Sequence, residues 1–116
     1  MNIKSSLFLM GALISLSFAV NAGQCPIADP TSSPTFCPTF KAAAQCGCRQ
    51  HVPSVMCQNM NAIYNRMIAM FGNLQRVCEY QKDTPVQTCI DGWTCYRLGG
   101  KDSQGNLCSS TGLACQ

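Results

Sequence analysis

Cysteine content limits what this chain can fold into more than any other feature. The sequence has ten cysteines among 116 residues, and all of them lie after position 24. Cysteine at this density is typical of small exported domains that disulfides stabilise in place of a large core. Because the number of cysteines is even, we predict five disulfides. The residues are Cys25, Cys37, Cys46, Cys48, Cys57, Cys78, Cys89, Cys95, Cys108 and Cys115.

The first 22 residues have the pattern of a secretory signal peptide. Lys4 gives this end a positive charge, an apolar run extends from Leu7 to Val20, and a small residue, Ala22, precedes the expected cleavage point. The apolar run of about 14 residues is shorter than the roughly 20 that a membrane-spanning helix needs. We therefore predict that residues 23–116 form one secreted domain, either extracellular or in a bacterial periplasm.

Two helices are expected in the first part of this domain. Residues 23–37 are rich in proline, serine and threonine, which predicts an extended arm pinned by its cysteines. The next residues favour a short helix at 38–46, which Gly47 is expected to end. Apolar residues then recur at spacings of three and four, which predicts a long amphipathic helix over about 53–81. The two helices would pack as a helical hairpin spanning 38–82.

The predicted long helix restricts the disulfide pairing. Cys57 and Cys78 are 21 positions apart, which is roughly 32 Å along a helix. A disulfide requires Cα atoms within about 7 Å, so these two cysteines cannot pair with each other. If the short helix folds back on the long one, Cys57 meets Cys46 or Cys48. Cys78 is then left for Cys25 or for a C-terminal cysteine.

A small β-hairpin is predicted in the C-terminal region, 83–116. Val86–Ile90 and Trp93–Leu98 are rich in β-branched and aromatic residues, and they flank the pair Asp91-Gly92, which favours a two-residue hairpin turn. The predicted fold class is therefore mainly α and disulfide-rich, with one C-terminal hairpin. Residues 107–111 are expected to return as a third short strand.

The hairpin also predicts how the C-terminal cysteines pair. In a two-residue turn Cys89 and Cys95 point to opposite faces, so they should not bond to each other. A third strand would bring Cys108 beside the hairpin, which makes Cys95–Cys108 a plausible disulfide.

The stretch Cys89-Ile90-Asp91-Gly92-Trp93-Thr94-Cys95-Tyr96-Arg97-Leu98 resembles part of the granulin module, which runs Cys-x-Asp-Gly-x-Thr-Cys-Cys-x-Leu. The sequence departs from that pattern at Tyr96, where the module has the second cysteine of a pair. The resemblance covers about a tenth of the secreted domain. It implies stacked, disulfide-tied hairpins in an extracellular signalling or interaction protein.

Catalytic and metal sites find little support in the sequence. Cys46-Gly47-Cys48 is best explained by two separate structural disulfides, because thiol–disulfide enzymes use Cys-x-x-Cys at a helix start. His51, the only histidine, has no acidic neighbour that would orient it as a catalytic base. We therefore predict no enzyme activity, no cofactor and no metal. A small secreted hydrolase and a copper-binding protein with methionine ligands are further alternatives.

Two sets of residues are candidates for binding. Trp93, Tyr96 and Arg97 lie together on the predicted hairpin, and these residue types are enriched at binding hot spots. Trp93 would alternatively cover the apolar face of the long helix as part of the core. If that face is not fully covered, it offers a groove for an acyl chain or a partner helix. Its residues are Met56, Met60, Met67, Met70, Phe71 and Leu74.

The sequence thus favours a secreted, non-catalytic interaction protein such as an effector, a toxin-like factor or an inhibitor. Its expected partner is a protein that a disulfide-rigidified surface binds. The alternative is a protein that binds lipid or a membrane surface through the methionine-rich face. Nucleic acid is not an expected partner, because the net charge is only +3 and the basic residues are scattered along the chain.

Overall fold

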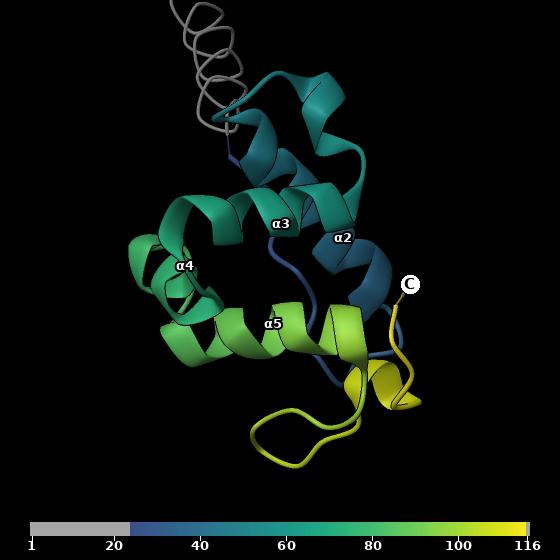
Figure 1. The fold of residues 1–116 in the computed structure, drawn as a ribbon. Helices are drawn as coiled ribbons and strands as arrows, with labels where there is room; N and C mark the ends of the chain where they lie inside the picture. Colours follow the sequence, from purple (N-terminus) through teal and green to yellow (C-terminus); the bar gives the residue numbers. More distant parts are fainter. Residues whose placement is uncertain (1–23, 116) are drawn as a thin grey trace, which may run out of the picture.

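The computed structural model describes residues 24–115, so the predicted signal peptide at 1–22 lies outside the described residues. Within this range the chain is mainly helical, as predicted (Figure 1). There is no β-strand in the described part, only an isolated antiparallel bridge between Lys101 and Leu107. The elements are α2 (Phe36–Arg49), η1 (Ser54–Cys57), α3 (Met60–Phe71), α4 (Leu74–Tyr80), α5 (Val86–Leu98) and η2 (Cys108–Ser110), where η denotes a 3-10 helix.

The first helix, α2, extends beyond the predicted 38–46 at both ends. Gly47 does not end the helix but lies inside it. A glycine inside a helix costs only about 1 kcal/mol relative to alanine. The disulfides of Cys46 and Cys48 hold the helix on either side of this glycine. Covalent restraint therefore offsets the weak local propensity.

The single long helix predicted at 53–81 is wrong, and its first part already departs from the prediction. Ser54–Cys57 form only the short helix η1. Asn59 then starts α3, because its side chain accepts a hydrogen bond from the backbone N–H of Ala62 at 3.1 Å. Asparagine is among the best residues for this capping position. Asn59 is thus a helix cap, and α3 begins after it.

A second break separates α3 from α4. Gly72 has a φ of +99°, a conformation that glycine adopts more readily than any other residue, and its N–H closes α3 on the carbonyl of Ile68. Asn73 caps α4 by accepting a hydrogen bond from the Arg76 N–H at 2.9 Å. The glycine–asparagine pair therefore turns the chain, which folds α4 against α5.

The predicted β-hairpin at 86–98 is also wrong, because this segment is the helix α5. Cys89, Trp93 and Tyr96 recur at spacings of four and three, which is the helical period. Their side chains face the core as one helical stripe. The hairpin that the granulin resemblance implies for this segment is therefore absent as well.

The third strand expected at 107–111 does not form. This segment holds the bridge residue Leu107 and the helix η2. Ser109 and Ser110 have φ values of +58° and +67°, so the backbone turns here and cannot run on as a strand.

The predicted five disulfides form, and no cysteine in residues 24–115 is free. Cys57 pairs with Cys48, one of its two expected partners, and Cys95 pairs with Cys108 as expected. Cys46 and Cys48 belong to different disulfides, which confirms their structural role. The pairs are Cys25–Cys46, Cys37–Cys115, Cys48–Cys57, Cys78–Cys89 and Cys95–Cys108.

One core joins α2, α3 and α5, and the Phe40 ring lies at its centre. The centroid of that ring is 5.2 Å from Phe36, 5.0 Å from Trp93 and 5.5 Å from Tyr96. Aromatic pairs at such separations add to the free energy gained by burial. The buried residues of the core are Phe36, Cys57, Met60, Ile63, Trp93, Cys95, Tyr96 and Cys108.

Alanine substitution at two helical glycines should change the free energy of unfolding in opposite directions. A Cβ on Gly92 would lie 2.8 Å from Cε1 of Phe40, so Gly92→Ala should lower the free energy of unfolding by about 1–3 kcal/mol through overpacking. A Cβ on Gly47 meets nothing within 4 Å, so Gly47→Ala should raise it by about 0.5–1 kcal/mol. Urea denaturation followed by circular dichroism measures both. Equal effects of the two substitutions would contradict close packing of α2 against α5.

Candidate functional site

The predicted binding residues Trp93, Tyr96 and Arg97 lie on α5 but do not form an exposed surface. Trp93 is 6% exposed and Tyr96 is 5% exposed. Burial raises the pKa of the Tyr96 hydroxyl. The Arg97 guanidinium carbon lies 3.9 Å from the centroid of the Tyr64 ring, so this side chain packs onto α3. These residues hold α3 against α5, which leaves no hot-spot surface of the predicted kind.

The methionine-rich face is split by the breaks in the predicted long helix. Met60 is buried in the core, Leu74 packs against it, and Met56 is exposed on η1. The remaining residues, Met67, Met70 and Phe71, line a cavity. Part of the face is therefore uncovered, as the lipid-groove alternative requires.

The cavity has a volume of about 1320 Å³ and lies between α2, α3, the α4–α5 connection and the N-terminal arm (residues 24–35). Each helix contributes one apolar face to its wall. From α2 come Phe36, Phe40, Ala43 and Ala44; from α3 come Ile63, Met67, Met70 and Phe71. Exposed residues at its edge, including Met70 at 69% and Tyr80 at 65%, leave the cavity open to solvent.

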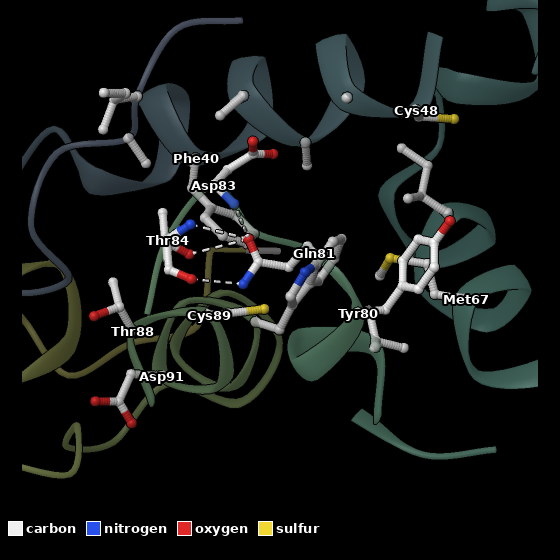
Figure 2. A pocket seen from close by; sticks show the side chains of 18 of the residues that line it. Phe40, Cys48, Met67, Tyr80, Gln81, Asp83, Thr84, Thr88, Cys89 and Asp91 are labelled. Atoms are coloured by element: carbon white, nitrogen blue, oxygen red, sulfur yellow. Dashed lines mark hydrogen bonds between the residues drawn. The ribbon is translucent and has the colours of Figure 1, made fainter. Parts of the chain in front are cut away.

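The cavity has one apolar side and one polar side. Figure 2 shows Met67 and Tyr80 along one side, with Thr84, Thr88 and Asp91 along the other. The Phe71 and Tyr80 rings, 4.8 Å apart, extend the apolar side where α3 meets α4. An amphipathic molecule would meet a matching environment at each end.

Gln81 fixes the polar side of the cavity. Its Oε1 accepts hydrogen bonds from the backbone N–H groups of Asp83 and Thr84, each at 3.0 Å (Figure 2). Its Nε2 donates to the carbonyl oxygens of Cys78 at 2.9 Å and Thr84 at 2.7 Å. One side chain thus organises the whole α4–α5 turn, which holds Asp83 and Thr84 at the cavity wall.

Four of the five acidic residues of the chain line this cavity, namely Asp29, Asp83, Asp91 and Asp102. Asp91 accepts hydrogen bonds from Gln87 at 3.0 Å and from the Ser103 hydroxyl at 2.6 Å. Asp102 accepts from the Asn106 N–H at 3.0 Å and from the Thr31 hydroxyl at 2.8 Å, and these bonds lower its pKa. The hydrogen-bond partners named here are uncharged, so none of them is a cation that pairs with either carboxylate.

The basic residues at the cavity do not neutralise these carboxylates. Arg66 donates to the Met56 carbonyl at 3.4 Å, and Lys82 donates to the Glu79 carbonyl at 2.9 Å. The Asp83 carboxylate has no hydrogen-bond or ion-pair partner within residues 24–115, although its backbone N–H donates to Gln81. The lining therefore carries unpaired negative charge, although the whole chain is positively charged.

Sequence reasoning missed the polar side of this site. The predicted hairpin puts Thr88 in its first strand and Asp91 in its turn, whereas α5 places both at the cavity. Their spacing of three is the helical signal that would have grouped them.

The other candidate chemistry finds no site in the described part of the chain. His51 is exposed at the cavity edge. Residues 24–115 contain no group of three His, Cys, Asp or Glu side chains arranged to hold a metal ion. None of the helices in this range combines the length and the apolarity needed to cross a bilayer.

Comparison with known proteins gives no relative. No family model, curated protein or solved structure matches this chain. The function must therefore be inferred from the cavity itself.

Proposed function

We propose that this chain is an exported, non-catalytic binding protein for a single-chain amphiphile. The cavity of about 1320 Å³ carries the proposal. Ligand sites in proteins are typically apolar cavities of about 300–1000 Å³ with a few placed polar groups. This cavity is large enough for such a ligand and has the same division between apolar and polar walls. Burial of Trp93 and Tyr96 removes the main support for a protein-binding hot spot.

The apolar tail would lie between α2 and α3, against Phe40, Ile63, Met67 and Phe71. Methionine side chains are flexible and polarizable, so they adapt to tails of different shape. Each methylene group moved out of water contributes about 0.8 kcal/mol. Affinity should therefore rise steeply with tail length until the tail fills the cavity.

The headgroup would be an amine. A positively charged group complements the carboxylates of Asp83 and Asp91, which both line the cavity. Thr84 and Thr88 add hydroxyl groups beside them. An anionic headgroup would be repelled by the same carboxylates, since like charges in a partly desolvated site are unfavourable.

The disulfides are consistent with the proposal that this protein is exported. Five disulfides with no free cysteine in residues 24–115 suit an oxidising compartment. A rigid, crosslinked domain also suits a carrier that keeps its cavity open without ligand, because pre-organisation lowers the entropy cost of binding. A secreted or periplasmic location is therefore part of the proposal.

Titration calorimetry with linear alkylamines, kept below their micellar concentrations, tests the proposal. Between eight and twelve carbons, each added methylene should lower the Kd about fourfold. Met67→Lys should weaken binding at least about tenfold, because it places a charge against the tail. Met56→Lys is the matched control, since Met56 is exposed on η1 and does not line the cavity. No binding by any alkylamine or matched fatty acid would overturn the proposal.

The same measurement tests the headgroup. Dodecylamine should bind at least about tenfold more tightly than dodecanoate, and Asp83→Asn combined with Asp91→Asn should abolish that preference. Glu79→Gln is the control, because Glu79 lies outside the cavity and interacts with Gln75 at 2.9 Å. Tighter binding of dodecanoate would contradict the amine assignment while leaving the tail site in place.

A further inference from the structure

We infer that residues 26–28, here named the strap, form a movable wall whose displacement widens the opening of the cavity and so speeds ligand exchange. In Figure 1 the N-terminal arm passes behind the space between α3 and α5, and all three strap residues line the cavity. The ligand-exchange part of this inference rests on the proposed amphiphile site. The motion itself does not, and it can be measured without ligand.

The strap is held only at its ends. Pro26, Ile27 and Ala28 make no hydrogen bond within residues 24–115. Ile27 is 83% exposed although it borders the cavity. Segments with few hydrogen bonds and little burial are those that open most easily in a native protein.

The two anchors of the strap differ in kind. On the N-terminal side the disulfide Cys25–Cys46 ties the chain to the end of α2. On the other side the anchor consists of hydrogen bonds: the Asp29 N–H donates to the Thr39 hydroxyl at 2.9 Å, and Thr31 accepts from the Ser109 N–H at 2.6 Å. The disulfide is the only covalent restraint on the strap's N-terminal side within the described residues, so it should limit how far the strap moves.

The strap has unfilled space beside it. Pro26 and Ile27 line the main cavity and also a second hollow of about 450 Å³, to which Gln24 and Cys25 contribute. The strap therefore borders both hollows, which also adjoin each other at Ala43, Gly47 and Asp83. Its displacement would uncover the inner wall of the cavity, including Trp93, without breaking any hydrogen bond of the strap itself.

Two variants release the strap in different ways. Cys25→Ser with Cys46→Ser removes the covalent anchor, while Pro26→Gly with Ala28→Gly loosens the strap and keeps the disulfide. Stopped-flow measurements with dodecylamine should show both association and dissociation rates rising about tenfold in each variant. Pro53→Gly is the control, because it adds similar backbone freedom at an exposed residue outside the cavity.

A ligand-free measurement separates this inference from the proposed function. Trp93 is the only tryptophan and lines the cavity, so acrylamide quenching of its fluorescence reports access to the cavity. The quenching constant should rise about twofold in both released variants and stay unchanged in Pro53→Gly. Increased quenching without amphiphile binding would support the inference that the strap moves but would contradict the proposed function. An unchanged quenching constant in a folded released variant would contradict the inference that the strap moves. If the serine variant does not fold, the glycine variant provides this test.

Discussion

Replacing Cys37 and Cys115 together by serine should lower the free energy of unfolding by about 4–5 kcal/mol. This disulfide joins residues 78 positions apart and ties the start of α2 to the C-terminal segment. A crosslink that closes a long loop removes the most conformational freedom from the unfolded chain. Equilibrium unfolding in urea, followed by far-ultraviolet circular dichroism, measures the change.

The matched control is Cys48→Ser with Cys57→Ser, which opens a loop of only 9 positions. Chain entropy predicts a loss about 2 kcal/mol smaller for this pair. If both double variants lose the same stability, the disulfides act mainly through native contacts, and loop closure is not the reason for their large contribution.

Trp93→Ala should lower the free energy of unfolding by about 3–5 kcal/mol, because it leaves a large space in the core. The Trp93 ring lies 5.0 Å from Phe40 and 5.6 Å from Tyr64, so it joins α2, α3 and α5. Urea denaturation followed by circular dichroism is again suitable, since the variant has no tryptophan fluorescence.

Leu98→Ala controls for the loss of an apolar side chain from α5. Leu98 is 67% exposed, so this substitution should change stability by less than about 0.5 kcal/mol. A Trp93→Ala variant as stable as the original chain would show that Trp93 contributes little to the core.

The candidate site was only partly predictable. The methionine-rich face and its use as an apolar groove follow from spacing, and Met67, Met70 and Phe71 do line the cavity. The carboxylate side did not follow, because Asp83 reaches the cavity on the α4–α5 turn and Asp91 reaches it on α5. That turn depends on the Gln81 hydrogen bonds, which no periodic pattern reveals.

The sequence by itself determined the covalent character of this protein and its mainly helical class. Ten cysteines in so short a chain require crosslinks, and the spacing of apolar residues before Gly72 requires helix. These conclusions depend on composition and on neighbours three or four positions away, so they can be drawn without knowing the tertiary structure.

Tertiary structure alone decided whether 86–98 became strand or helix. Asp91-Gly92 favours a hairpin turn locally. In the folded chain, however, Gly92 lies within α5, where its lack of a side chain lets the Phe40 ring pack against the helix. The disulfides Cys78–Cys89 and Cys95–Cys108 hold that helix near both ends. A short segment has similar local free energies in the two conformations, so contacts with residues far away in the sequence choose between them.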